Sequence, residues 1–574
     1  MLVSSAAAAM DGDGKEDANK QRLDWATMNL ERGVVGGEKN GGNASRKPPI
    51  GIVRLFLACM VSGGIQYGWA LQLSLLSPYS QTLGISHSYV SLTWICGPIA
   101  GFVVQPIVGY YSDRCTSKMG RRRPFILAGC IIICLSVIII GFSADIGRRM
   151  GDTKEHCSTF TGSRWYAAAV YIVGFWFLDF ANNTVQGPAR AMMADLAGEH
   201  VFRCRFLYLN SITRTQRSAG LVMLMFVCSF TAAAGQHGPN VGQAIFSLWM
   251  ALGSVLGYLA GANAKWHEWL PWLKTAACCD ACANLKGAFL TAVILIILTM
   301  SVTLWLADEE VVDKDNVDAS GGGACSAFVD LFKSLKNLPP AMFSVLAVTA
   351  VTWLSWFPFI QYNTDWMGRE IFHGEPQGAG GKADLYDAGV REGAVGLLFC
   401  SIALGVTSFL IPKLCRKLTS RVVWSISNLM VFVLMTAMVV LGIVSMKGYR
   451  PSLAASLSAG PEHRFKSGAL AIFALIGIPQ AVLFSVPWAV VSEVAAEEGG
   501  GQGLTIGVLN IAIVLPQLVI ALSAGPIDGA FNKGNTPALG IGGVFALICA
   551  VLALVLLPKT RGVSHAAIMA GGGH

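Results

Sequence analysis

The stretch ADEEVVDKDNVDASGGGACSAFVDLFKSLKNLPP, residues 307–340, divides the sequence into two parts of similar pattern. It is polar and charged, whereas long apolar windows make up most of the chain on either side. A helix needs about 20 apolar residues to cross a bilayer. Such windows lie near residues 52–76, 90–111, 124–143, 165–188, 242–262 and 286–306 before the stretch, and near 341–361, 391–411, 423–444, 467–490, 504–524 and 538–557 after it. This repeated pattern predicts an all-α membrane protein with 12 transmembrane helices in two six-helix halves.

The composition agrees with a protein that spans a lipid bilayer many times. Of 574 residues, 53% are hydrophobic and 13% are charged, whereas soluble proteins carry about 25% charged residues. The mean hydropathy is +0.55. The net charge of +8 is spread over loops, so it indicates orientation in the membrane and excludes a nucleic-acid partner.

The remaining segments set the expected domain boundaries. We expect a disordered tail over 1–49, an N-terminal half over 50–306, a linker over 307–340, a C-terminal half over 341–560 and a tail over 561–574. The loops at 112–124 and 412–421 are both densely basic, which is typical of the cytosolic side. With six spans between these loops, the linker is also expected in the cytosol.

The segment 199–237 does not fit this count. Its apolar run is about 16 residues long, short for a span, and a seventh crossing would put the two basic loops on opposite sides. We therefore expect that 199–237 is an atypical insertion that does not cross the membrane. A retained intron, a gene-model error and a real insertion all remain open.

The stretch LDFANNTVQGPARAMMADL, residues 178–196, places charges where a span should be apolar. A charge at the bilayer centre costs about 2.5–3.5 kcal/mol on insertion scales, so such groups face a protein interior or a water cavity. A carboxylate that moves between apolar and polar surroundings takes up and releases a proton, which makes Asp179 a candidate for proton coupling. Arg190 lies on the same helix face but about 16 Å along the axis, and Gly187-Pro188 between them is expected to bend the helix.

Polar side chains around this carboxylate are candidates for binding a polyol. Amides can hydrogen-bond sugar hydroxyls, and an indole can stack on a sugar ring. The candidate substrate-binding residues are Gln66, Trp69, Gln72, Asp179, Asn182, Asn183, Gln186 and Arg190. For the amides, packing between helices is an equally good interpretation.

Two further features lie at the ends of spans. Asp365 and Arg369 have the i,i+4 spacing of a helical ion pair, and Glu370 adds a second acid. His87 lies in the short loop GISHSY and is interpreted as a polar outer-loop residue, with a role at the substrate entrance as the alternative.

Enzyme, metal and cofactor motifs are not visible in the sequence. There is no GxSxG, HExxH or Walker loop, so we expect no catalytic residue, no metal and no cofactor other than H+ as a coupling ion. Among 15 cysteines the only cluster is CCDAC, 278–282. Small residues at a helix end are the favoured interpretation, and a disulfide with Cys157 is the alternative.

Long strings of the sequence resemble plant sucrose–proton symporters, in the glycoside–pentoside–hexuronide branch of the major facilitator superfamily. The loop GYYSDRCTSKMGRRRP (109–124) resembles the superfamily signature, and the strings GWALQLSLLSPY, WICGPIAGFVVQP, LDFANNTVQGPARAMMADL, TAACCDACANLK, NTDWMGREIFHGEP and VPWAVVSE occur in the family's order. The resemblance covers about residues 50–560.

The resemblance implies twelve spans with both termini in the cytosol. It also implies that Asp179 is proton acceptor and sugar ligand, that Arg190 lies beside the site, and that His87, Asp365, Arg369 and Glu370 match family positions. The conformational-switch loop implied by the superfamily signature contains Gly109, Asp113, Arg114, Gly120, Arg121 and Arg122.

The sequence departs from the family at three places. Asn363 stands where the family has Asp, which removes one charge from the set after span seven. Lys118 stands where Arg is usual, and the segment 199–237 is extra.

The predicted function is proton-coupled symport of sucrose, and of related glucosides, by alternating access. The partners are then sucrose, H+ and the bilayer, with a homo-oligomer left open. The plasma membrane is the expected location, with the vacuolar membrane as alternative. A uniporter or other glycoside carrier and a non-transporting sugar sensor are the rival functions.

Overall fold

A computed structural model gives the fold. It describes residues 52–157, 162–197, 238–307, 309, 329, 338, 340–377, 381–408, 410–448, 463–497, 502–531 and 534–558. These residues belong to one unit, Ile50–His574. The expected tails at 1–49 and 561–574, the segment 199–237 and nearly all of the linker lie outside the described residues.

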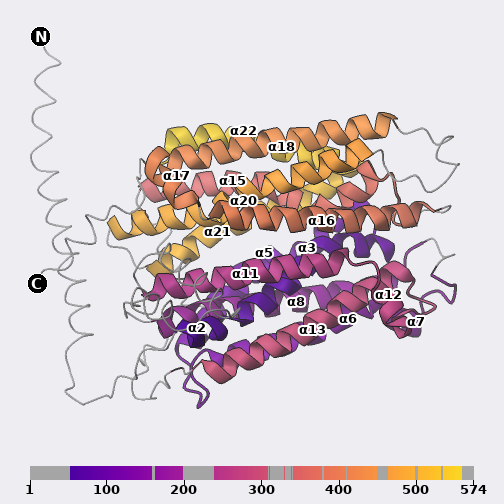
Figure 1. The fold of residues 1–574 in the computed structure, drawn as a ribbon, viewed down its shortest axis with the longest axis horizontal. Helices are drawn as coiled ribbons and strands as arrows, with labels where there is room; N and C mark the ends of the chain where they lie inside the picture. The colour runs from indigo at the N-terminus through magenta and orange to yellow at the C-terminus, as the bar shows by residue number, and fades with distance from the viewer. Residues whose placement is uncertain are drawn as a thin grey trace, which may run out of the picture. The chain divides into compact units, whose positions relative to one another are not determined.

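The six apolar windows of the N-terminal half are helical (Figure 1), and those near 52–76 and 90–111 are each divided between two helices. The helices of this half are α2 (Ile52–Ala58), α3 (Val61–Thr82), α4 (His87–Thr93), α5 (Cys96–Asp113), α6 (Arg123–Gly141), α7 (Ser143–Met150), α8 (Trp165–Ala197), α11 (Gly238–Ala262), α12 (Trp266–Trp269), a 3-10 turn (Pro271–Leu273) and α13 (Asp280–Leu306). α8 continues through Gly187 and Pro188 as one helix.

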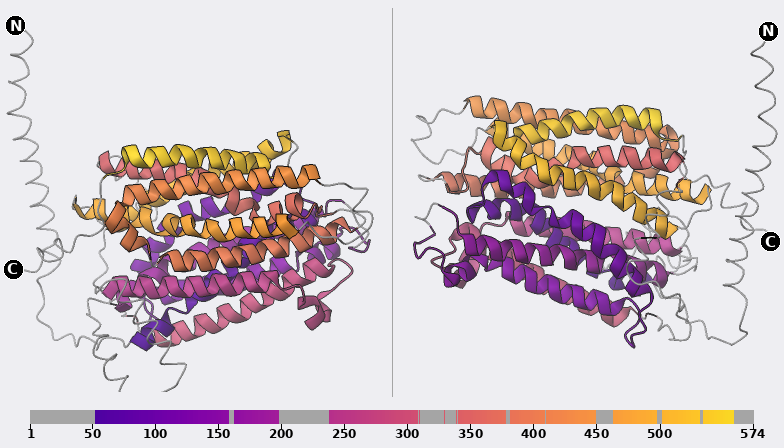
Figure 2. Two further views of the ribbon diagram at one scale, coloured as in Figure 1. Left: turned by 45° about the horizontal axis from the view of Figure 1, so that its top comes forward. Right: turned by 180° about the vertical axis from the view of Figure 1, so that it is seen from behind.

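The C-terminal half repeats this arrangement with six long helices and one short one. They are α15 (Pro340–Trp366), which continues as the π-helical turn η3 (Met367–Ile371), α16 (Lys382–Ser408), α17 (Ile411–Leu418), α18 (Ser420–Gly448), α20 (His463–Glu497), α21 (Gln502–Phe531) and α22 (Thr536–Leu556). In two further views the halves lie side by side, the N-terminal half in indigo to magenta and the C-terminal half in orange to yellow (Figure 2).

Within the described residues, nine helices are long and apolar enough to cross a membrane by length and composition. α3 and α8 are long but fall outside this group, and α11 contributes the shorter apolar portion Leu248–Ala262. α3 and α8 are the helices that carry the polar residues predicted to bind substrate. Their lower hydropathy therefore reflects the side chains that face the protein interior.

Helix packing follows the same pattern in both halves. α3 packs on α11 and α13 as α15 packs on α21 and α22. α5 packs on α8 as α16 packs on α20, and α6 packs on α13 as α18 packs on α22. The two halves are thus structural repeats, as the repeated windows predicted.

The contacts between the halves also occur in matching pairs. α4 and α5 pack against α21, and α11 packs against α16. If the twelve spans are numbered in chain order, span 2 (α4 and α5) contacts span 11 (α21), and span 5 (α11) contacts span 8 (α16). Exchanging the two halves turns the first of these contacts into the second. A movement of one half relative to the other would therefore change the contacts between the residues of these paired helices.

Candidate functional site

Asp179 lies in the middle of α8, and its side chain is completely buried. Gln72 Nε2 on α3 donates to Asp179 Oδ1 at 2.6 Å, and the Cys96 thiol on α5 donates to Asp179 Oδ2 at 2.9 Å. Gly97 leaves room for the carboxylate, because a Cβ there would lie 3.4 Å from Asp179 Oδ2. Three helices thus meet at one carboxylate, and the side chains that donate to it are uncharged.

The two Asn residues after Asp179 extend this network. Asn182 Nδ2 lies 3.4 Å from Gln72 Oε1, and Asn183 Nδ2 donates to the carbonyl oxygen of Asp179. Gln105 Nε2 on α5 donates to Asn183 Oδ1 at 2.7 Å. Asn510 Nδ2 on α21 donates to Gln105 Oε1 at 3.2 Å, so the network reaches the C-terminal half.

The remaining predicted binding residues lie on the same two helices. Gln66 and Trp69 are half-buried on α3, and Gln186 is half-buried on α8. The Trp69 indole nitrogen is buried and has no hydrogen-bond partner among the described residues. An unsatisfied buried donor is unusual in a protein interior, and here it lies three residues from Gln72, on nearly the same helix face.

Arg190 lies three turns further along α8 than Asp179. Its guanidinium lies 4.7 Å from the centre of the Phe246 ring, and Nη2 contacts the Met250 sulfur at 3.1 Å, both on α11. The structure thus shows Arg190 against α11, whereas Asp179 contacts α3 and α5. That Arg190 lies beside the bound sugar stays a prediction.

A second polar cluster surrounds Asp365, which is also completely buried. The predicted i,i+4 ion pair is present, with Arg369 Nε 3.2 Å from Asp365 Oδ1. Gln81 on α3 donates to Asp365 at 2.7 Å and accepts from Arg369, and the Tyr386 hydroxyl on α16 donates to Asp365.

Asn535 joins the two acids of this cluster. Its Nδ2 donates to Asp365 Oδ2 at 2.8 Å, and its backbone N–H donates to Glu370 Oε1 at 2.6 Å. Asn363, in contrast, points its amide at its own helix, where Nδ2 donates to the carbonyl oxygens of Phe359 and Ile360. The side-chain oxygen of Asn363, Oδ1, is buried and has no hydrogen-bond partner among the described residues.

The interpretation of His87 as a polar residue in an outer loop was wrong. His87 is the first residue of α4, and its ring lies between two buried carboxylates. Nδ1 lies 3.5 Å from Asp365 Oδ2, and Nε2 lies 3.8 Å from Asp528 Oδ2 on α21. Sequence spacing missed this arrangement because the three residues lie far apart in the chain.

The predicted conformational-switch loop is organised around Glu309, just after α13. Its carboxylate accepts from the backbone N–H groups of Arg122 and Arg123, at 2.9–3.2 Å, and lies 3.7–3.9 Å from the Nε atoms of Arg121 and Arg122. Gly120 has a φ of +103°, and a Cβ there would collide with Glu309. Burial raises the pKa of the Glu309 carboxyl, and the N–H groups and guanidinium groups around it oppose this rise.

The other members of this loop make local contacts. The Arg114 guanidinium lies 4.0 Å from the centre of the Tyr110 ring, and Gly109 accepts a hydrogen bond from Ser112. Asp113 is the last residue of α5. The switching role of these residues stays a prediction.

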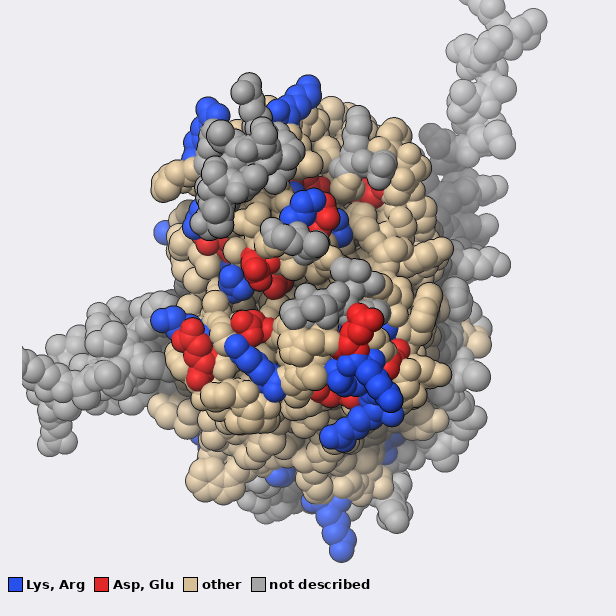
Figure 3. Space-filling model, turned by 90° about the vertical axis from the view of Figure 1, so that its right-hand side faces the viewer, with Lys and Arg blue, Asp and Glu red and all other residues tan. Residues whose placement is uncertain are grey.

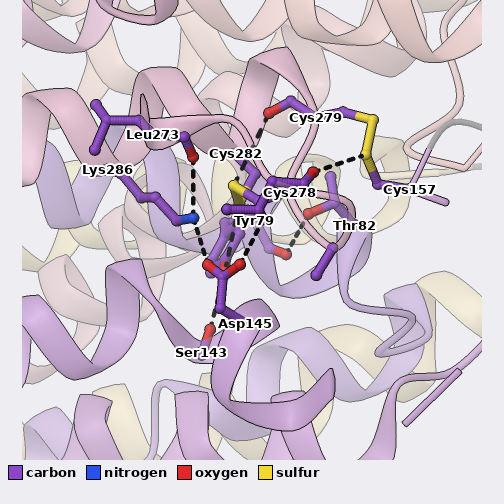
Figure 4. Close-up of a disulfide and its surroundings, with 12 residues drawn as sticks. Tyr79, Thr82, Ser143, Asp145, Cys157, Leu273, Cys278, Cys279, Cys282 and Lys286 are labelled. Atoms are coloured by element: carbon purple, nitrogen blue, oxygen red, sulfur yellow. Dashed lines mark hydrogen bonds and ion pairs between the residues drawn. A yellow bond between two sulfur atoms is a disulfide. The ribbon is translucent and has the colours of Figure 1, made fainter. Parts of the chain in front are cut away.

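The favoured interpretation of the CCDAC cluster was also wrong. Cys157 pairs with Cys279, and Cys278 pairs with Cys282 (Figure 4). Both disulfides lie at the start of α13, which brings them to the end of the bundle that carries α7 and α12 (Figure 1). We call this the disulfide end.

Below these disulfides lies a buried ion pair that the sequence analysis missed. The Lys286 side chain is completely buried, and its ammonium donates to Asp145 on α7 and to the carbonyl oxygen of Leu273 (Figure 4). A lysine inside an apolar window was a visible signal, because a buried charge requires a partner.

Acidic and basic side chains are interspersed over the disulfide end (Figure 3). Lys274 pairs with Asp280, Lys382 with Glu375, and Lys466 with Glu392. The disulfide end is therefore a surface of mixed charge.

Comparisons with known proteins agree with this architecture. Residues 62–264 match the family described as MFS/sugar transport protein. A sucrose transport protein SUT5 of Oryza sativa subsp. japonica is 73% identical over 564 residues, with 98% of both chains covered. The chain belongs to the sucrose transport protein family. The sucrose transport protein SUC3 of Arabidopsis thaliana is 46% identical, with 88% of both chains covered.

Solved structures of other transporters share the fold. The xylose transporter XylE from E. coli matches with a TM-score of 0.54 at 12% identity, covering 89% of this chain and 99% of that one. The nucleoside transporter NupG matches with a TM-score of 0.53 at 11% identity, covering 88% and 98%. The prediction of a multi-pass major facilitator carrier, and not an enzyme, is confirmed.

Proposed function

We propose that this protein carries sucrose together with a proton across a membrane by alternating access, with Asp179 as the proton carrier. The observation that carries the proposal is the set of side chains around Asp179. The buried carboxylate is held by an amide and a thiol, and within the described part of the chain no cation pairs with it to fix the ionised form. It can therefore be occupied by a proton or left ionised, as a coupling site requires.

The sugar site is proposed on the polar faces of α3 and α8. Gln72, Asn182 and Asn183 offer hydrogen-bonding groups beside Asp179, and the unpartnered Trp69 indole N–H supplies a free donor. From the other half, Gln361 on α15 adds a buried amide whose nitrogen and oxygen have no partner among the described residues. A disaccharide with many hydroxyl groups can satisfy such groups from both halves.

Gln66, Gln186 and Arg190 complete the proposed substrate-binding set. Proton coupling is assigned to Asp179 with Arg190, and the charged set Asp365, Arg369 and Glu370 is assigned to closure of the disulfide end. The relatives' names state sucrose transport, which supports sucrose as the substrate. The proposed location is the plasma membrane.

The disulfides support an orientation. Disulfides persist in oxidising compartments and are rare in the cytosol. We therefore place the disulfide end outside, and the loop around Glu309, the linker and both termini in the cytosol. This agrees with the basic loops 112–124 and 412–421.

The energetics are sufficient for accumulation. One charge crossing 100 mV supplies about 2.3 kcal/mol, and about 1.36 kcal/mol corresponds to a tenfold concentration ratio. A carrier that moves one proton with each sucrose would hold roughly a fiftyfold gradient from the potential alone.

Sucrose-induced current in voltage-clamped oocytes tests the proposal. We expect an inward current that grows as the outside solution becomes more acidic. Sucrose uptake without current, independent of pH and voltage, would establish a uniporter. Neither current nor uptake, with the protein confirmed at the cell surface, would exclude transport and favour a sensor.

A further inference from the structure

His87 is placed where the two halves of the protein touch at the disulfide end. α4 packs against α21 at close range, because Gly525 and Gly529 have no side chain at the contact. A Cβ at Gly525 would collide with the carbonyl oxygen of Ser88, and a Cβ at Gly529 would collide with its hydroxyl. The Gly525 N–H donates to Ser91 Oγ at 3.1 Å. This packing fixes the start of α4, and with it His87, against the C-terminal half.

Both ring nitrogens of His87 face carboxylates of the other half. Nδ1 lies 3.5 Å from Asp365 Oδ2, and Nε2 lies 3.8 Å from Asp528 Oδ2. Both carboxylates are completely buried, whereas the His87 side chain is 17% exposed. Asp528 Oδ2 has no hydrogen-bond partner among the described residues, and His87 Nε2 lies 3.8 Å from it.

The charges around His87 favour a cation at this position. The facing groups are the carboxylates of Asp365 and Asp528, with Glu370 behind Asp365, the guanidinium of Arg369, and the phenols of Tyr362 and Tyr386. The two carboxylates that contact the ring, Asp365 and Asp528, outnumber the one guanidinium of Arg369. A neutral imidazole donates from one nitrogen and turns a lone pair toward the other carboxylate, whereas imidazolium donates from both.

We propose that His87 is the bridge between Asp365 and Asp528 that holds the two halves together and keeps the disulfide end closed. The bridge joins α4 of one half to α15 and α21 of the other, so its loss lets the halves separate there. That the disulfide end faces outside, where a membrane-impermeant reagent can reach it, is the part of this inference that rests on the proposed function. The site is distinct from Asp179, whose partners are Gln72 and Cys96.

Cysteine accessibility tests this inference without measuring transport. Ser91→Cys places a thiol on the face of α4 that α21 covers, in the full chain in oocyte membranes. The rate of labelling by a membrane-impermeant methanethiosulfonate reports opening of the disulfide end. The Ser91→Cys chain is compared with the same chain carrying His87→Gln, His87→Lys or Asp528→Asn, and the chain without Ser91→Cys gives the background.

His87→Gln should label about tenfold faster than the Ser91→Cys chain, since buried carboxylates that lose their partner in the other half are strongly disfavoured. Asp528→Asn should also label faster. His87→Lys should label as slowly as the Ser91→Cys chain, because it keeps a cation.

Comparison of variants at one pH removes the pH dependence of the thiol itself. His156→Gln, on the exposed outer loop, is the matched control and should leave the rates unchanged. Equal labelling of the Gln and Lys variants would overturn the inference, as would a labelling rate of His87→Gln no faster than that of the Ser91→Cys chain. If the labelling rates follow the expected order but sucrose induces no current, the result contradicts the proposed function and not this inference.

Discussion

Asp179 and Asp365 are both completely buried, but they are held by different kinds of partner. Asp179 receives hydrogen bonds from an amide and a thiol, all within the N-terminal half. Asp365 receives them from Arg369, Gln81, Tyr386 and Asn535 and faces His87, so its partners come from both halves. A carboxylate with neutral partners can change its protonation state with little rearrangement, whereas one paired with a cation is fixed as an anion.

The comparison assigns different tasks to the two sites. The central site can bind and release a proton, and the cluster around Asp365 holds the two halves together at the disulfide end. The three predictions that follow extend this comparison, and they run from the largest expected effect to the smallest.

The cation beside Asp365 should contribute more to stability than the charge of Asp179. Arg369→Gln leaves Asp365 buried without its ion-pair partner and should lower the free energy of unfolding by roughly 3 kcal/mol. Asp179→Asn keeps the shape of the side chain and should change stability by about 1 kcal/mol or less. Thermal unfolding of the purified protein in detergent measures both. If both variants lost the same free energy of unfolding, the ion pair at Asp365 would contribute no more to stability than the charge of Asp179.

The disulfides extend the comparison to the surface of the disulfide end. The bond between Cys157 and Cys279 spans 122 residues, whereas the one between Cys278 and Cys282 spans 4. Replacing Cys157 and Cys279 by Ala should lower stability by roughly 2–4 kcal/mol, because it frees the longer loop. Replacing the other pair is the matched control and should have a smaller effect. The sucrose-induced current should persist in both variants, and its loss would contradict a purely structural role.

Two glutamines of α3 provide the most closely matched test. Gln72→Leu leaves Asp179 with the thiol of Cys96 as its donor, and the sucrose-induced current should fall about tenfold, the change expected for about 1.4 kcal/mol. Gln81→Leu leaves Asp365 with three donors and should reduce the current by less than about threefold. The reverse order would show that the cluster around Asp365, and not the central site, limits transport.

Much of the fold could be predicted because a transmembrane helix can be recognised from the apolar composition of its own segment. All twelve apolar windows lie in helices, and the repeated halves are present. Single polar residues within these windows, such as Gln72 and Asp179, were also visible, because an uncompensated polar group in a span is costly.

The partners of these residues could not be predicted, since they depend on how distant helices align. Cys96, Gln81 and Asn535 look like ordinary helix or loop residues in the sequence. His87 could be recognised as part of a charged cluster only once α4 was placed against α15 and α21. The disulfide between Cys157 and Cys279 was only the alternative interpretation for the same reason.

The measurement that tests the account most directly is sucrose-driven proton uptake into liposomes that contain the purified protein, followed with an internal pH indicator. Asp384→Asn, at an exposed carboxylate of α16, serves as the matched control. We predict that sucrose acidifies the interior for the original chain and for Asp384→Asn, and that Asp179→Asn abolishes this acidification. Continued proton uptake with sucrose in Asp179→Asn would contradict the assignment of Asp179 as the proton carrier.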